Sequence, residues 1–314
     1  MLFRKELCDH LQSMRFLVLF LLLFVISCAS LSGAISTLAQ NALQTSDGQT
    51  SVSDFMFLEL FTTSGNSIYS FTTFLGFLGP IFGIMLGFDA VNNEQAQGTL
   101  NRLAAQPIYR DTIINAKFAA GAVLIFMTVF SLGGFVTGFG ILLSGLTPQA
   151  EEVARVLLFL LMASVYISVW LAFAIFFSVI CRHAATAALA CVAVWLFLTM
   201  FLSLVASNIA GIVYPTSGIG AQFNALKNYQ LQVGLNRISP YYLFSEATTM
   251  ILNPNVRSLS IMSLLEYQKG AIASYLSFGQ SVLEIWPHLV GMFALAAVGF
   301  ALAYISFMRR EIRA

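Results

Sequence analysis

The side chains best suited to specific polar interactions lie together in one segment that runs from Asp89 to Lys117. The segment also carries an acid at Glu94 and a base at Arg110, and it separates two long apolar stretches. Its pattern predicts a short helix, because Glu94 stands near the start, where the helix dipole favours an acid, and Pro107 ends the helical run. Such a helix exposes a small apolar patch between polar ends, and an exposed patch of this kind favours docking by a soluble partner.

The sequence predicts no catalytic, metal-binding or cofactor-binding site within this chain. No Gly-x(4)-Gly-Lys-[Ser/Thr] motif occurs, so the chain has no P-loop with which to bind ATP. The three histidines are scattered and form no His-Glu-x-x-His pattern, which argues against a metalloprotease helix. The four cysteines include no Cys-x-x-Cys pair, so neither a zinc site nor a disulfide framework is expected.

Composition places the chain in a lipid bilayer. Of its 314 residues, 58% are hydrophobic and only 9% are charged, whereas soluble domains carry about 25% charged residues. The formal net charge is +1 and no basic cluster stands out, so no nucleic-acid partner is expected. Membrane lipid is the expected surroundings.

Apolar runs long enough to cross a bilayer predict an all-α, polytopic membrane protein with six transmembrane helices. No Asp, Glu or Lys falls within these runs, and Arg155 lies at the edge of one. The predicted spans cover residues 16–38, 68–88, 118–146, 154–180, 184–212 and 288–307.

The basic residues predict a multi-pass protein of the cell membrane with both termini in the cytosol. With that orientation most Lys and Arg residues lie on the cytosolic side, as the positive-inside rule requires. The run that ends in Cys28 is similar to a lipoprotein signal, which is the alternative for the first span. Glu6 and Asp9 in its basic region, and the five spans that follow, argue against cleavage.

Two segments outside the spans are expected to be helical. Residues 1–15 predict an amphipathic interfacial helix, with Phe3, Leu7 and Leu11 on its apolar side and Glu6 elsewhere on its surface. Residues 213–287 predict an extracytoplasmic helical segment before the last span. Either amphipathic helices on the outer leaflet or a small external domain fits its composition.

Glycines four residues apart predict close packing between spans. Gly79, Gly83 and Gly87 stack on one face of the second span, where another backbone can approach. Gly134 and Gly138 repeat the spacing in the third span.

The polar segment resembles the membrane subunits of ABC-2 type transporters. The family pattern is similar to Asp-x(4)-Glu-x(3)-Gly-Thr-Leu, followed by a leucine, a proline, an arginine and a lysine before the next span. The matching residues here are Asp89, Glu94, Gly98, Thr99, Leu100, Leu103, Pro107, Arg110 and Lys117. The stretch from Ser239 to Pro254 resembles the outer region of the copper-enzyme-maturation and gliding-motility branch, although the outer segment is longer than in minimal members.

The resemblance implies that residues 1–314 form one ABC-2 type transmembrane domain, the permease subunit of an ATP-driven exporter. It implies that 89–117 is a coupling loop gripped by a separate cytosolic ATPase, which would bind the ATP and Mg²⁺; Arg102 belongs to this loop as well. It further implies a dimer with a second copy or a paralogous permease. An ordinary cytosolic loop is the alternative interpretation of this segment.

Two other functions stay open on the sequence alone. One is an ion-coupled secondary transporter, a class that usually keeps ionisable groups at mid-membrane, where this sequence has none. The other is an assembly subunit that uses ATP-driven motion to act mechanically on an external protein. The sequence does not identify the substrate.

Overall fold

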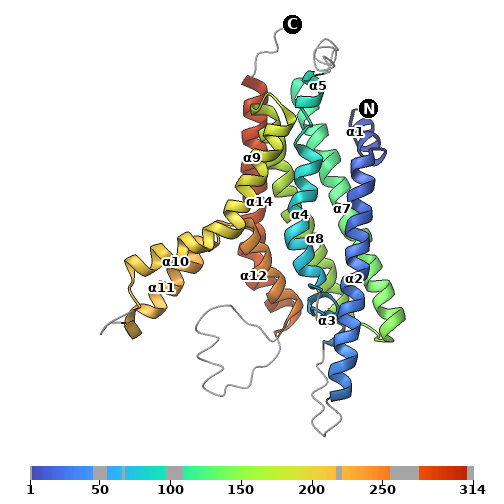
Figure 1. The fold of residues 1–314 in the computed structure, drawn as a ribbon, viewed down its shortest axis with the longest axis vertical. Helices are drawn as coiled ribbons and strands as arrows, with labels where there is room; N and C mark the ends of the chain where they lie inside the picture. The colour runs from blue at the N-terminus through green and yellow to red at the C-terminus, as the bar shows by residue number, and fades with distance from the viewer. Residues whose placement is uncertain are drawn as a thin grey trace.

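The chain is described here from a computed structural model, which covers residues 2–44, 55–65, 68–96, 109–216, 221–254 and 276–309. Every element within these ranges is a helix. Six of the helices are long and apolar enough to cross a membrane, which confirms the predicted fold class. Figure 1 shows them side by side, with the N-terminal α1 and the C-terminal end of the last helix at the same end of the bundle. We call this the terminal end, and the opposite end the far end.

The first half of the described chain contains α1 and three membrane-crossing helices. Ser13 separates the first two helices: its hydroxyl donates to the His10 carbonyl (2.8 Å) and accepts from the Phe16 N–H (3.2 Å). Ser70 caps α4 by accepting from the Thr73 N–H, as expected of an N-cap serine. The bounds are α1 Leu2–Leu11, α2 Met14–Gln44, α3 Met56–Thr62, α4 Phe71–Gly87, α5 Asn92–Ala96 and α7 Arg110–Ser144.

The second half contains the other three membrane-crossing segments, with the shorter helices α11 and α12 between the last two of them. Gly145, in the left-handed conformation, ends α7, and the Glu152 carboxylate accepts from the Gln149 N–H at the start of α8. The bounds are α8 Ala150–Ile180, α9 Ala184–Leu196, the π-helix η1 Phe197–Phe201, α10 Leu202–Val213, α11 Ala221–Asn236, α12 Pro240–Leu252 and α14 Phe278–Arg309.

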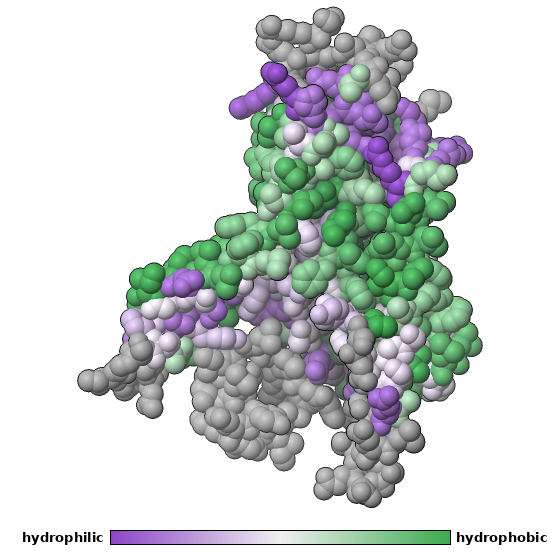
Figure 2. Space-filling view, in the orientation of Figure 1, coloured by the Kyte–Doolittle hydropathy of each residue, from purple (hydrophilic) through white to green (hydrophobic). Residues whose placement is uncertain are grey.

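Helix α8 lies at the centre of the bundle. It packs against α4, α7, α9, α12 and α14, and its Phe159, Tyr166 and Trp170 side chains are fully buried. Tyr166 satisfies its hydroxyl inside the bundle by donating to the Gly76 carbonyl at 2.8 Å. In the view of Figure 2, hydrophobic residues form a broad band across the middle of the molecule, and hydrophilic residues gather at the terminal end.

The glycines of α4 lie against α8. A Cβ added at Gly83 would meet the Ile167 carbonyl oxygen at 2.6 Å, and one added at Gly87 would meet the Leu171 carbonyl oxygen at 2.9 Å. At Gly79 the nearest atom is an Ile167 side-chain carbon at 2.8 Å. These contacts bring the two backbones together without room for a methyl group.

Gly134 and Gly138, by contrast, contact no other helix among the described residues. A Cβ at either position would meet nothing within 4 Å. Within the described part of this single chain, their spacing therefore does not reproduce the close packing of the second span, and packing against another chain stays a prediction.

Helices α7 and α14 begin well before the spans that hydropathy predicts. Helix α7 begins at Arg110, so the last part of the expected 89–117 loop is helical. Lys117 lies within this helix, seven residues past its start. Helix α14 begins at Phe278, so the end of the expected 213–287 segment is continuous with the last span. Polar residues at these helix ends are buried against neighbouring helices, which a hydropathy window does not detect.

The fifth span is bent. The π-helical turn η1 separates α9 from α10, and an inserted turn of this type changes the direction of a helix. Beyond it α10 pairs with α11, and Figure 1 shows this hairpin projecting sideways from the bundle. Asn228 closes the hairpin by donating to the Tyr214 carbonyl at 2.8 Å.

Helix α12 lies inside the bundle rather than on its surface. Leu243, Phe244 and Ala247 are almost fully buried, and the helix packs against α8, α14, α3 and α4. Of the expected extracytoplasmic segment, α12 thus forms part of the core at the far end, and α11 belongs to the lateral hairpin. Residues 255–275 lie outside the described ranges.

Candidate functional site

Three helices meet at the terminal end through one buried cation. Lys117 of α7 donates from Nζ to Glu6 Oε2 of α1 at 3.0 Å and to Glu94 Oε1 of α5 at 2.8 Å. The side chains of Lys117, Glu6 and Glu94 are 5%, 9% and 15% exposed. We call these residues the Lys117 cluster. One ammonium group pairs with two carboxylates, Glu6 and Glu94, that lie 88 residues apart in the sequence. The cluster therefore fixes α1 and α5 to the same point on α7.

A second ion pair reinforces this arrangement from the surface. The Arg15 guanidinium contacts the Asp89 carboxylate, and its carbon Cζ lies 5.7 Å from the centre of the Phe88 ring. The Arg15 side chain is 61% exposed, so solvent screens this pair. It contributes less than the Lys117 cluster but connects the start of α2 to the segment after α4.

The turn that leads into α5 is held by a serine of the central helix. Ser178 of α8 is fully buried, and its hydroxyl accepts from the backbone N–H groups of Val91 (3.0 Å) and Asn92 (3.3 Å). Among the residues that the structure describes, the buried Asn92 side-chain amide has no hydrogen-bond partner. The start of α5 is therefore attached to α8 as well as to α7.

A polar cleft of about 480 Å³ lies between α1, the start of α2, the end of α4 and α5. Burial lowers the pKa of His10 in this cleft, and the nearby Lys117 lowers it further against the opposite effect of Glu6. The cleft therefore favours the neutral form of this imidazole. The cleft is lined by Lys5, Glu6, Asp9, His10, Ser13, Met14, Arg15, Met85, Leu86, Asp89, Ala90, Asn93, Glu94 and Lys117.

The described part of the predicted coupling loop contains four of its predicted residues. Asp89, Glu94 and Lys117 converge on the cleft, whereas Arg110 lies with its guanidinium carbon 6.0 Å from the Phe307 ring centre of α14. The other predicted residues lie outside the described ranges; these are Gly98, Thr99, Leu100, Arg102, Leu103 and Pro107.

Two residues that hold this end of the bundle together, Glu6 and Ser178, were not predicted from the sequence. Glu6 was expected on the exposed surface of the N-terminal helix, but it is 7% exposed and pairs with Lys117. Its position one turn from Phe3 and beside Leu7 was the available signal, since that spacing puts Glu6 near the apolar face. Ser178 was hidden within an apolar run, where a single hydroxyl carries no distinctive pattern.

A second group of buried charges lies at the far end. Arg155 was expected at the edge of a span, yet it is fully buried and bound on every side. Its guanidinium donates to Glu151 (2.7 Å), to the backbone carbonyls of Ile251 (2.9 Å) and Leu276 (2.7 Å), and to the Ser281 hydroxyl (3.0 Å). It thereby connects α8 to the end of α12 and the start of α14.

Glu246 of α12 forms a further buried pair nearby. Its carboxylate accepts two hydrogen bonds from Arg237, at 3.0 and 2.8 Å, and lies 2.7 Å from Nε2 of His288. Burial alone raises the pKa of Glu246, but the hydrogen bonds from His288 and Arg237 outweigh it and lower the pKa to about 2. The ion pair with Arg237 attaches α12 to the residues just before it, and the contact with His288 attaches α12 to α14.

The described residues contain no group of three or more His, Cys, Asp or Glu side chains that could hold a metal ion. Their charged groups instead join helices at both ends of the bundle.

Comparison with known proteins identifies the family. The profile of the ABC-2 family transporter proteins matches residues 1–312, which is nearly the whole chain. No curated protein matches the chain.

Proposed function

Because the chain belongs to the ABC-2 transporter family, we propose that it is the permease subunit of an ATP-driven exporter, moved by a separate cytosolic ATPase. Membrane subunits of ABC transporters belong to a complex in which ATPase subunits supply the energy. The proposal includes two further points: the 89–117 segment receives the movement of the ATPase, and transport is directed outward.

The Lys117 cluster is the observation that carries the coupling proposal. A push on α5 reaches α7 through the Glu94–Lys117 pair, α1 through Glu6, and α8 through Ser178. A short helix such as α5 can pass movement on to the bundle only when it is attached to helices that have two stable arrangements. Helix α5 is short, is attached to three other helices, and leads directly into the polar segment where an ATPase would bind.

The proposal places ATP and Mg²⁺ on the partner ATPase and none in this chain. It also places the terminal end in the cytosol of a cell-membrane protein. The excess of basic residues near that end supports this orientation by the positive-inside rule. A dimer with a second copy or a paralogous permease, surrounded by lipid, completes the proposed complex. The copper-maturation and gliding-motility branch stays a prediction.

The coupling proposal is tested by co-expressing the full chain with the ABC ATPases of its source organism. Glu94→Gln removes one charge of the Lys117 cluster, so we expect weaker stimulation of ATP hydrolysis in the reconstituted complex. Glu284→Gln is the matched control, because Glu284 is exposed in α14 near the far end. Equal stimulation by Glu94→Gln, Glu284→Gln and the unchanged chain would show that α5 does not couple the two subunits.

Orientation is tested with native Cys8, which is exposed on α1. A membrane-impermeant maleimide should label Cys8 only after the cells are opened. Tyr69→Cys supplies the opposite control, since Tyr69 is exposed next to α4 at the far end and should react in intact cells. Labelling of Cys8 in intact cells would reverse the proposed topology while leaving the family assignment untouched.

A further inference from the structure

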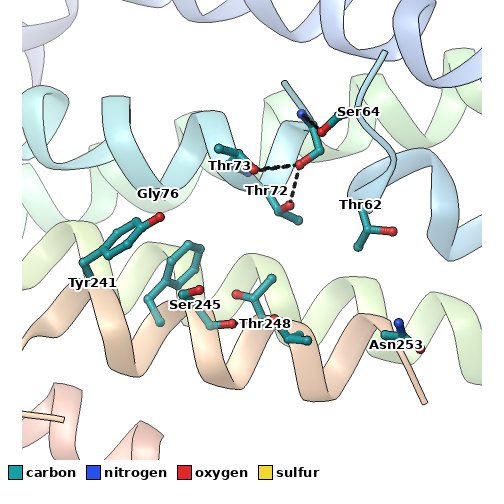
Figure 3. Close-up of a pocket in the computed structure, with 12 residues that line it drawn as sticks. Thr62, Ser64, Thr72, Thr73, Gly76, Tyr241, Ser245, Thr248 and Asn253 are labelled. Carbon is teal, nitrogen blue, oxygen red and sulfur yellow. Dashed lines mark hydrogen bonds between the residues drawn. The ribbon is translucent and has the colours of Figure 1, made fainter. Parts of the chain in front are cut away.

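A polar cavity of about 250 Å³ lies at the far end, between the start of α4 and helix α12. Figure 3 shows its side chains projecting from the two helices toward each other. Nine of the twelve lining residues carry a hydroxyl group, and none carries a charge. The cavity is thus chemically distinct from the charged cleft at the terminal end and from the buried ion pairs around Arg155 and Glu246.

One buried hydroxyl in this cavity lacks a partner. Thr248 is 6% exposed, and its Oγ1 has no hydrogen-bond partner within the described ranges. Its neighbour Thr249 shows the usual solution, since that hydroxyl donates to the Ser245 carbonyl one turn back at 2.9 Å. Thr248 makes no such bond, although helical threonines commonly do. A buried polar group without a partner is costly. Thr248 is also one of the lining residues, so a rotation of its side chain would bring the hydroxyl to a ligand in the cavity.

Three of the other hydroxyls form a hydrogen-bonded set at the start of α4, across the cavity from α12. Ser70 Oγ lies 3.0 Å from the Thr72 hydroxyl and 2.9 Å from the Thr73 hydroxyl, and Figure 3 shows the dashed lines that end on Thr72 and Thr73. Ser70 also accepts from the Thr73 N–H and is fully engaged, whereas the Thr72 and Thr73 hydroxyls retain capacity for a further partner. Such a lining matches a ligand that is itself rich in hydroxyl groups.

An aromatic ring closes the cavity on the side of Gly76. A Cβ at Gly76 would lie 3.1 Å from Cε2 of Tyr241, so the absence of a side chain lets the Tyr241 ring rest on the backbone of α4. Tyr241 also packs against Phe77, with ring centres 5.2 Å apart. The cavity therefore combines one aromatic wall with hydroxyl groups on the others. This lining is more polar than that of most small-molecule sites, which are largely apolar, and it favours a polar ligand.

Charge and size restrict the class of ligand. A phosphate or carboxylate would enter without any cation in the lining to compensate its lost hydration. The volume is slightly below that of sites for drug-sized molecules, so one ring fits better than an extended chain. We propose that this cavity binds one neutral, hydroxyl-rich ring of monosaccharide size, either a free sugar or the headgroup of a glycolipid.

The proposal is tested by binding to the full chain in phosphatidylcholine nanodiscs, after purification in a detergent without a sugar headgroup. One arm uses equilibrium dialysis with radiolabelled methyl β-glucoside. The other uses native mass spectrometry with a monoglucosyl diacylglycerol, and phosphatidylglycerol serves as the charged control. We expect one molecule per chain in at least one arm, which also identifies the source of the sugar ring.

Thr248→Val provides the decisive variant. It keeps the shape of the side chain and removes a hydroxyl that holds no internal hydrogen bond, so the fold should be retained. The loss of one hydrogen bond to the ligand should weaken binding about threefold to tenfold. Thr199→Val is the matched control, because Thr199 in η1 also has an unpartnered hydroxyl but does not line the cavity.

Three results would overturn the proposal: no binding in either arm, equal binding by Thr248→Val and the unchanged chain, or equal occupancy by phosphatidylglycerol. Weakened binding by Thr248→Val alone would support it. The measurement contains no ATPase, so its outcome is independent of the coupling proposal.

Discussion

Replacing Lys117 with methionine tests the physical basis of the terminal-end assembly. The substitution keeps a long unbranched side chain but removes the ammonium group shared by Glu6 and Glu94. Two carboxylates that are 9% and 15% exposed then lose the ammonium group that joins them. Breaking a buried ion pair by removing one partner costs about 3–5 kcal/mol, and exposures this low leave little solvent screening to reduce the loss.

The loss is measured as thermal unfolding in nanodiscs, followed by tryptophan fluorescence. We expect Lys117→Met to lower the unfolding temperature by at least about 5 °C. Lys227→Met is the control for the chemical change itself, because Lys227 is exposed on α11. Its unfolding temperature should stay within about 1 °C of the unchanged chain, since surface substitutions have small effects.

A compensated variant separates lost charge pairing from lost packing. Combining Lys117→Met with Glu6→Gln and Glu94→Gln removes all three charges, so most of the stability should return. An unchanged unfolding temperature for Lys117→Met would refute the reasoning. Failure of the triple variant to recover would mean that packing of the lysine stem, rather than its charge, dominates.

Three further predictions concern the rest of the bundle. Gly83→Ala should destabilise the protein by about 1–3 kcal/mol, because its methyl group would collide with the backbone of α8. Gly138→Ala is the control and should leave the stability unchanged, because a Cβ there meets nothing within 4 Å. The unfolding temperatures of the two variants compare them directly. Arg155→Gln should cost about 3–5 kcal/mol in a denaturant titration, because partners on three segments lose a buried cation; an effect below about 1 kcal/mol would contradict this. The pKa of Glu246 is about 2 in the folded protein and 4.5 ordinarily, so its ionised form stabilises the fold above about pH 4.5. This contribution should disappear as the pH falls from 4.5 towards 2, and Glu246→Gln should flatten the decline in unfolding temperature over that range.

Hydropathy was sufficient to predict the membrane-crossing helices but not their ends. Apolar windows identify the residues that face hydrocarbon, and all six predicted spans correspond to such helices. They do not register a helix that continues through polar residues, as α7 does between Arg110 and Lys117. The same limit hid the first turns of α14, from Phe278 onward.

Most partners of the buried charges could not be predicted, because they lie in distant parts of the chain. Glu6 and Lys117 are 111 residues apart, and no local pattern connects them. Glycine spacing was similarly insufficient: Gly83 contacts a neighbouring backbone and Gly138 contacts none, although both belong to four-residue repeats. Whether a small residue is needed depends on which helix lies opposite, and that information is not local.

The position of Arg155 imposes an order on biosynthesis. Its partners at Ile251, Leu276 and Ser281 are translated 96, 121 and 126 residues later. When α8 leaves the ribosome, only Glu151 is available to this guanidinium, and hydrocarbon would be a costly surrounding for it. The hydrogen bonds that join α8 to α12 and α14 through this guanidinium can therefore form only after the last membrane-crossing helix has been made, so a chain that ends before α14 lacks the partners at Leu276 and Ser281.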